Sequence, residues 1–178
     1  MTFREIYQEY IERDGSKDLL DWLDSTDFFA APASTKYHEC YHGGLAEHSE
    51  KVFNELVRLL KAYPEVRVTA ETAAIVALLH DVCKVNCYKV EYRNRKNDRG
   101  QWEKYPVYIF KEDFAYGGHG SKSVYLIQKF MPLTEQEAVA INCHMGAGPN
   151  DYNVFDAYRA YPLAFLLHTA DMAATINF

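Results

Sequence analysis

The strongest constraint in this sequence is an uninterrupted apolar segment, Ala73–Leu79, that runs directly into His80 and Asp81. Thr69 can cap a helix there, and the Ala and Leu content predicts a helix at about 70–82 in the centre of the fold. The apolar segment is far too short to cross a bilayer, so it predicts a core helix and no membrane association. A buried carboxylate is costly unless it is paired or bound to a cation, so Asp81 needs a partner.

Further apolar periodicity predicts helices along most of the chain. The expected helices lie at about 3–11, 19–23, 45–63, 121–131, 134–145 and 161–175. Residues 88–110 differ, because two segments rich in Tyr, Val and Ile flank a polar turn, a pattern typical of a β-hairpin. A chain of 178 residues matches the size of one domain, spanning 1–178. We therefore predict an all-α helical bundle with a β-hairpin insertion at about residues 88–110.

Two other polar residues lie where the sequence predicts a buried helix face. His48 shares the apolar stripe of the helix at 45–63, and Asp171 follows the apolar run Leu163–Leu167. Either residue alone is most simply explained as a hydrogen-bonded core residue. With the histidine–aspartate pair described above, they place imidazole and carboxylate groups on three apolar helices. A divalent metal ion would offset both carboxylates and bind neutral imidazole nitrogen, so these residues predict a metal site.

The order of these residues resembles the H…HD…D pattern of the HD-domain metal-dependent phosphohydrolases, from about Pro32 to the C-terminus. The motif LLHDVCK ends an apolar helix and lies between EHS in one predicted helix and TADMA in another. The segment PASTKYHECYHGGLAEHS is also similar to the HD domain of bacterial 3′→5′ exoribonucleases, and small phage-type HD hydrolases share this layout. The resemblance implies an HD-domain fold and a metal-dependent phosphohydrolase.

Two further histidines, His119 and His144, fall between the HD pair and the final aspartate. In the binuclear branch of the family, two histidines in this interval bind a second metal ion, so the resemblance implies two divalent ions bridged by Asp81. The other implied ligands are His48, His80 and Asp171 at one ion and His119 and His144 at the other. The alternative for these last two histidines is contact with substrate phosphate. A ligand set of His and Asp can bind Mn, Fe, Co, Ni, Zn or Mg, so it does not identify the metal.

Lys84 and His38 are further candidates for the site. The family often has a lysine three residues after the bridging aspartate, so the resemblance implies that Asp81 and Lys84 are catalytic and that Lys84 also binds substrate phosphate. The alternative is that Lys84 closes its helix against the C-terminal dipole. His38 stands where the related exoribonucleases have a histidine, so the resemblance implies a substrate-binding residue in the pocket.

The predicted hairpin carries a local cluster of basic residues interleaved with aromatic ones. The basic residues are Lys89, Arg93, Arg95, Lys96, Arg99 and Lys104, and the aromatic ones are Tyr88, Tyr92, Trp102, Tyr105 and Tyr108. Arg and Lys suit phosphates, and aromatic rings stack on bases. We therefore expect the hairpin to overhang the metal site and Arg93 and Trp102 to bind substrate. The alternatives are a solvated charged face and aromatic residues that pack on a second copy in a homodimer.

The charge balance and the cysteines limit the partners and the compartment. Lys and Arg number 19 against 25 Asp and Glu, a net charge of −6, which argues against a global basic field for binding duplex DNA. The first fifteen residues contain no apolar run typical of a signal peptide, and the four cysteines form no CxxC pair. The expectation is a cytoplasmic protein with reduced thiols.

These features together predict a phosphodiesterase-like hydrolase, in which metal-activated water attacks phosphorus in a nucleotide or a short single-stranded oligonucleotide. Other functions stay open at this point. The enzyme alternative is hydrolysis of nucleoside triphosphates or monophosphates. The non-enzyme alternatives are a sensor that binds a nucleotide and reports to a partner, and a metal site with a purely structural role.

Overall fold

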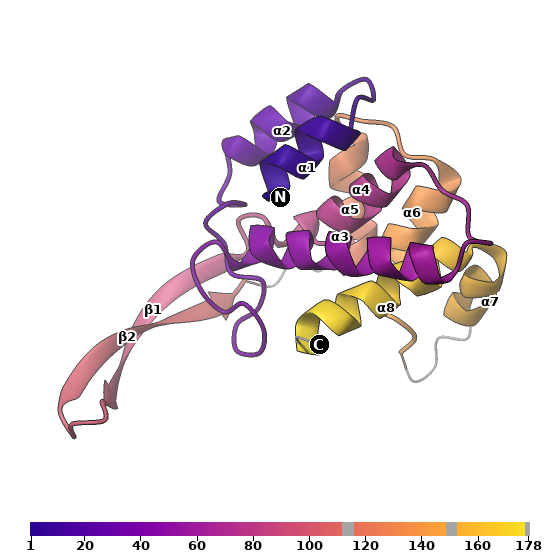
Figure 1. Ribbon diagram of the computed structural model, residues 1–178. Coiled ribbons are helices and arrows are strands. Elements are labelled where there is room, and N and C mark those ends of the chain that lie inside the picture. The colour runs from indigo at the N-terminus through magenta and orange to yellow at the C-terminus, as the bar shows by residue number, and fades with distance from the viewer. Residues whose placement is uncertain (112–115, 149–152, 177–178) are drawn as a thin grey trace.

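In the computed structural model, which describes residues 1–111, 116–148 and 153–176, helices form the body and one β-hairpin projects from it (Figure 1). The helices are α1 (Phe3–Tyr10), α2 (Ser16–Asp24), α3 (Gly44–Ala62), α4 (Ala70–Leu79), α5 (His119–Gln128), α6 (Glu135–Asn142), α7 (Asn153–Ala160) and α8 (Pro162–Ile176). The hairpin strands are β1 (Tyr88–Lys96) and β2 (Trp102–Phe110), and a short 3-10 helix, η1, spans Val82–Lys84. None of the described helices combines the length and apolar character that crossing a membrane requires.

The prediction of an all-α class is wrong. β1 and β2, with nine residues each, pair along their whole length in an antiparallel sheet. Their β-branched and aromatic residues favour an extended chain. The turn between them is closed by the Asn97 side chain, which accepts the backbone N–H of Gln101 at 3.0 Å, and by Gly100 at a φ of 75°. The fold is therefore mixed, with a helical body and a two-stranded sheet between η1 and α5 in the chain.

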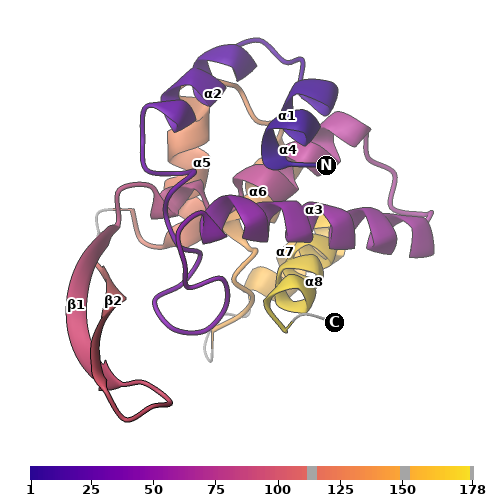
Figure 2. The ribbon, with the colours of Figure 1, turned by 60° about the vertical axis from the view of Figure 1, so that its left-hand side comes forward.

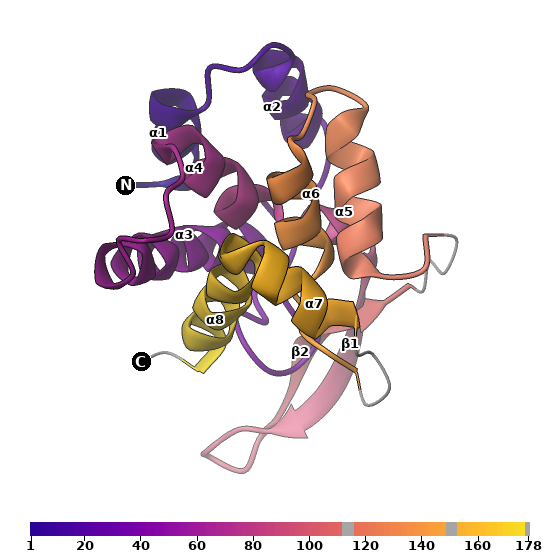
Figure 3. The same ribbon diagram turned by 90° about the vertical axis from the view of Figure 1, so that its right-hand side faces the viewer.

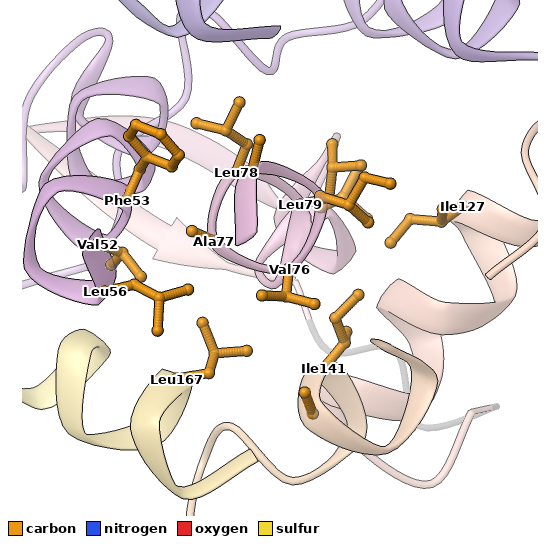
Figure 4. Close-up of a cluster of buried hydrophobic side chains, with 14 of the residues drawn as sticks. Val52, Phe53, Leu56, Val76, Ala77, Leu78, Leu79, Ile127, Ile141 and Leu167 are labelled. Atoms are coloured by element: carbon orange, nitrogen blue, oxygen red, sulfur yellow. The ribbon is translucent and has the colours of Figure 1, made fainter. Parts of the chain in front are cut away.

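α4 lies at the centre of the helical body, and all its residues from Ala73 to Leu79 are buried. A helix that is apolar on every side is stable only where neighbouring elements cover it all round. α3 and α6 pack against α4, and α8 packs against both α3 and α6 (Figure 3). Figure 4 shows side chains from α3, α4, α5, α6 and α8 that meet in this core. Those labelled there are Val52, Phe53, Leu56, Val76, Ala77, Leu78, Leu79, Ile127, Ile141 and Leu167.

Among the helices that end earlier than the periodicity predicts, α4 and α6 carry polar residues of the candidate site at their ends. α4 ends at Leu79, because His80 is its C-cap and Asp81 leaves the helical conformation with a φ of −105° and a ψ of 15°. α6 ends at Asn142, which leaves His144 just beyond the helix. α7 has no counterpart in the prediction. Each early end therefore places a buried histidine just beyond the last residue of its helix.

The hairpin leaves the body directly after η1, and its far end lies well away from the helices (Figures 1 and 2). Its base is anchored by two hydrogen bonds. The Tyr88 hydroxyl donates to the Ala33 carbonyl at 3.1 Å, and the Lys111 backbone N–H donates to the Cys87 carbonyl at 2.7 Å. Since Ala33 belongs to the loop between α2 and α3, this anchoring holds that loop beside the hairpin base.

Candidate metal centre

Histidine and carboxylate side chains from five helical segments and one loop converge in the interior. They are Glu39 in the loop before α3, His48 on α3, His80 and Asp81 at the end of α4, His119 at the start of α5, His144 after α6, and Asp171 on α8. These residues, together with His38 and Cys83, form four groups of three, and within each group the candidate ligand atoms lie within 4.8 Å of one another. The described part of the chain therefore contains buried His and Asp groups that can hold a metal ion.

Asp81 lies in the middle of this cluster, and its two oxygens face different histidines. Oδ2 is 3.4 Å from His80 Nε2 and 4.0 Å from His48 Nε2. Oδ1 is 3.5 Å from His144 Nε2. Asp171 lies on the side of Oδ2, next to the same two histidines. Its Oδ1 is 3.0 Å from His48 Nε2 and 3.9 Å from His80 Nε2. One carboxylate thus divides the cluster into two sets of donors.

Backbone carbonyls orient two of the histidine rings. Nδ1 of His80 lies 2.8 Å from the Ala77 carbonyl, and Nδ1 of His144 lies 2.7 Å from the Ile141 carbonyl. A carbonyl can only accept, so Nδ1 carries the hydrogen in each neutral ring and Nε2 keeps its lone pair. Both Nε2 atoms are buried and have no hydrogen-bond partner within the described residues. A buried acceptor without a partner costs about 1–3 kcal/mol, and a cation would supply that partner.

Asp81 is buried and stays ionised. Burial alone would raise the pKa of its carboxyl, but the Lys84 ammonium, 2.6 Å from Oδ2, and the neighbouring imidazoles hold that pKa well below its usual range. Burial lowers the pKa of Lys84, but the attraction of Asp81 outweighs this effect and raises that pKa above its ordinary value. Lys84 Nζ also donates to the Ala33 carbonyl at 2.7 Å. A buried lysine therefore balances the charge of the central carboxylate.

His48 lies between two carboxylates. Burial lowers the pKa of its ring, but the hydrogen bond with Asp171 and the contact with Glu39 outweigh this effect and raise that pKa to about 9. Burial raises the pKa of Asp171, but the same hydrogen bond from His48 brings it below its ordinary value. At neutral pH the His48 ring is therefore protonated. A metal ion can bind its Nε2 only after that proton has left.

His119 and Cys83 form one of the four groups with Asp81. His119 Nδ1 is buried without a hydrogen-bond partner in the described ranges, and burial lowers the pKa of the ring, so it is neutral and can act as a ligand. Cys83 Sγ is 3.9 Å from Asp81 Oδ1. Burial raises the pKa of this thiol to about 12, so Cys83 stays protonated and is a poor ligand beside the imidazole.

A cavity of about 200 Å³ opens onto the cluster. It is lined by the site residues His38, Asp81, Lys84, His119, His144 and Asp171, and by Met145, His168, Met172 and Thr175. Both ring nitrogens of His38 are buried and lack a hydrogen-bond partner among the described residues, and its ring centroid is 4.8 Å from that of His48. The structure thus brings the predicted residues His38 and Lys84 to the same cavity as the candidate ligands.

Glu39 is the member of the cluster that the sequence reasoning missed. Its Oε2 lies 3.5 Å from His48 Nδ1, and its Oε1 accepts from Lys51 Nζ at 2.6 Å. Burial raises the pKa of this carboxyl, but His48 and Lys51 lower it to about 2. The loop can fold this closely over α3 because residue 44 is glycine, where a Cβ would lie 2.0 Å from the Glu39 carbonyl oxygen. The glycine pair before His48 is the signal in the sequence that could have indicated this close approach.

Replacing Glu39 with glutamine is expected to weaken the binding of a divalent ion about tenfold. Glu39 faces Nδ1 of His48, so its carboxylate orients the ring and strengthens Nε2 as a donor, and loss of such an outer carboxylate weakens metal binding about 10- to 100-fold. Titration of the EDTA-treated protein with Mn²⁺ measures the effect. Glu47→Gln is the matched control, because Glu47 also contacts Lys51, at 3.2 Å, but lies on the surface. Equal affinity in the two variants would contradict this role.

The structure does not bring Trp102 to the cluster. Trp102 lies opposite Lys96 at the far end of the hairpin, with 70% of its surface exposed. The Lys96 ammonium lies over its ring at 5.5 Å from the centroid. Arg93 lines a separate groove beside β2. The hairpin does not overhang the cavity, since the described lining of the cavity contains no hairpin residue.

A comparison with models of known protein families finds no match, and neither do comparisons with curated proteins and with solved structures. The resemblance to HD-domain phosphohydrolases therefore rests on the residues of this chain alone. Their side chains form buried groups that can hold a metal ion.

Proposed function

We propose that this protein is a metal-dependent phosphohydrolase of the HD-domain family, and that it cleaves a phosphoester bond in a nucleotide or a short oligonucleotide. The proposed ligands of two divalent ions are His48, His80, Asp81, His119, His144 and Asp171. Asp81, whose two oxygens face different histidines, is the proposed bridging ligand. Lys84 and His38 are the proposed substrate-binding residues within the cavity.

The observation that carries this proposal is a set of buried imidazole nitrogens without partners around an ionised carboxylate. His80 Nε2, His144 Nε2 and His119 Nδ1 have no hydrogen-bond partner in the described chain, and all three rings belong to groups that also contain Asp81 or Asp171. Such an arrangement costs stability in a folded protein unless it serves a ligand. Nitrogen and carboxylate oxygen together are the donor set of Mn, Fe, Co, Ni and Zn, so the residues fit a divalent ion.

Divalent ions in this position supply Lewis acidity and lower the pKa of water to near neutrality. The chain itself supplies the remaining parts. Lys84 keeps a fixed positive charge next to Asp81, where it can attract an anionic phosphate. His38 lines the same cavity, neither of its ring nitrogens has a hydrogen-bond partner in the described ranges, and the ring can donate to a phosphoryl oxygen. The side chains of Met145 and Met172 are exposed and add apolar surface to the lining of the same cavity.

A substrate screen with defined metal content tests the proposal. EDTA-treated protein is reloaded separately with Mn²⁺, Fe²⁺, Co²⁺, Ni²⁺, Zn²⁺ and Mg²⁺ and incubated with ATP, AMP, a dinucleotide, a single-stranded pentanucleotide and bis(p-nitrophenyl) phosphate. We expect hydrolysis of the diesters with at least one metal. Release of nucleoside monophosphate indicates phosphodiester cleavage, whereas release of inorganic phosphate indicates a nucleotidase. Absence of turnover with every metal, at full metal occupancy, would contradict the enzyme and favour a nucleotide sensor.

A further inference from the structure

A groove of about 690 Å³ lies outside the metal cavity, between β2 and the loop that precedes α3. Its walls include Thr35, Lys36 and Cys40 from the loop and Arg93, Tyr105 and Tyr108 from the hairpin. In Figures 1 and 2 this loop lies beside the base of the hairpin, where the two strands leave the body. The groove is thus built from two segments that are held together by the Tyr88 hydroxyl and the Ala33 carbonyl.

The hairpin that forms one wall of the groove carries a net positive charge, whereas the whole chain is acidic. Between residues 88 and 110 there are six Lys and Arg against three Asp and Glu, while the protein carries a net charge of −6. Lys36 and Arg93 line the groove, and no acidic residue is among its described lining. Basic residues concentrated on one surface of an acidic protein favour a polyanionic ligand there.

Aromatic rings accompany these charges. Tyr105, Tyr108 and Phe110 line the groove, and the Arg95 guanidinium lies 4.9 Å from the centre of the Tyr105 ring. Tyr105 is also directly opposite Arg93 in the strand register. An aromatic ring next to a guanidinium is the combination on which an unpaired base stacks while its phosphate is bound. An acidic segment of another protein could pair with Lys36 and Arg93, but it has no base to stack on the aromatic rings.

The groove lies next to the metal cavity. Phe110 lines the groove, and its ring centroid lies 6.0 Å from that of His119, which lines the cavity. In the loop, Cys40 lines the groove while its neighbours His38 and Glu39 belong to the metal cluster. The cavity of 200 Å³ is below the size of about 300–1,000 Å³ that pockets for whole small ligands have. A substrate with its phosphate at the cluster must therefore extend outside the cavity.

We propose that this groove binds the single-stranded nucleic acid that flanks the reacting phosphate, so that the substrate is an oligonucleotide and not a free nucleotide. This inference rests on the proposed function for the identity of the reacting group, but the binding itself requires no metal. Lys36 and Arg93 contact the phosphates, and Tyr105 stacks on a base. The ligand that the groove recognises is an unpaired base on a sugar-phosphate chain. Both single-stranded DNA and single-stranded RNA provide it.

Binding to the EDTA-treated protein tests the groove independently of catalysis. Fluorescein-labelled single-stranded pentanucleotides of DNA and of RNA are titrated by fluorescence anisotropy with wild type, Lys36→Ala/Arg93→Ala and Tyr105→Ala. We expect Kd to rise at least about fivefold in Tyr105→Ala, because stacking on one ring is worth about 1–3 kcal/mol per base. In the double variant, the slope of log Kd against log salt is expected to fall by about 1.4, since each lost phosphate contact removes about 0.7.

The matched control for the double variant is Lys61→Ala/Arg67→Ala, which removes two exposed charges at the far end of α3 and in the loop after it. Its Kd is expected to equal that of wild type at physiological salt. The ratio of the DNA and RNA affinities shows which strand the groove prefers. We call Lys36→Ala/Arg93→Ala and Tyr105→Ala the groove variants. If they bind both pentanucleotides as tightly as the control does, the inference is wrong. It is also wrong if they alter only the sedimentation of the protein, because the groove is then a contact between copies.

Hydrolysis by the Mn²⁺-loaded protein separates this inference from the proposed function. The groove variants are expected to lose at least about fivefold in kcat/KM for the pentanucleotide. They are expected to keep wild-type rates on methyl p-nitrophenyl phosphate, a diester without a base. Equal losses on both substrates would overturn the groove as a binding site for the flanking strand. Absence of hydrolysis by wild type, with the binding differences retained, would instead overturn the proposed function alone.

Discussion

Replacing Asp81 with asparagine is expected to abolish stoichiometric metal binding and to reduce hydrolysis at least about 10³-fold. The two oxygens of Asp81 face His80 on one side and His144 on the other, so this carboxylate lies between the two sets of donors. Metal-ion catalysis contributes several kcal/mol to transition-state stabilisation, and about 4 kcal/mol corresponds to a factor of 10³. Metal content per chain by atomic emission and kcat/KM on the diester found in the screen measure the two effects.

The same substitution removes the partner of a buried lysine, which could unfold the protein for a separate reason. Lys84 Nζ is 2.6 Å from Asp81 Oδ2, and removing one member of a buried ion pair costs about 3–5 kcal/mol. The double variant Asp81→Asn/Lys84→Met removes both charges and is expected to recover most of that stability in urea denaturation. It is still expected to lack metal. Two ions per chain in either folded variant would contradict the bridging role of Asp81.

The apparent affinity for a divalent ion is expected to rise about tenfold per pH unit between roughly pH 6.5 and pH 9. The pKa of His48 is raised to about 9, so over this range its ring must lose a proton before Nε2 can bind the metal. Above about pH 9 this dependence should level off. Isothermal titration calorimetry in buffers with different ionisation enthalpies gives both the affinity and the number of protons released.

His48→Gln is the control, because it cannot release that proton and should bind metal weakly with little dependence on pH. Over the same interval, the EDTA-treated wild type should lose stability. A raised pKa means that His48 stabilises the fold fully below its unfolded pKa of about 6.5, and that this contribution disappears as the pH rises through about 9. An affinity in wild type that does not change from pH 6.5 to pH 8.5 would show that His48 is not a ligand.

Several features of the fold follow from local sequence patterns. Apolar spacing places most of the helices, and the Tyr-rich and Val-rich segments on either side of a polar turn place the hairpin strands. The class was nevertheless wrong, because a regular sheet of two nine-residue strands makes the fold mixed. The end of α4 at Leu79 and the short helix α7 were also missed. Periodicity is weakest at helix ends, where capping and packing decide the last turn.

For the site, the sequence alone predicted His48, His80, Asp81 and Asp171 as candidate metal ligands, because a histidine or an aspartate on an apolar helix needs a partner wherever that helix packs. Only the tertiary structure decided which atoms meet. It showed that Nε2 of His80 and Nε2 of His144, which face Asp81, have no hydrogen-bond partner among the described residues, and that Glu39 reaches His48. It also placed Trp102 at the far end of the hairpin, away from the cluster. Local patterns report the burial of each segment, whereas contacts between distant segments depend on how all the helices pack, and no single segment carries that information.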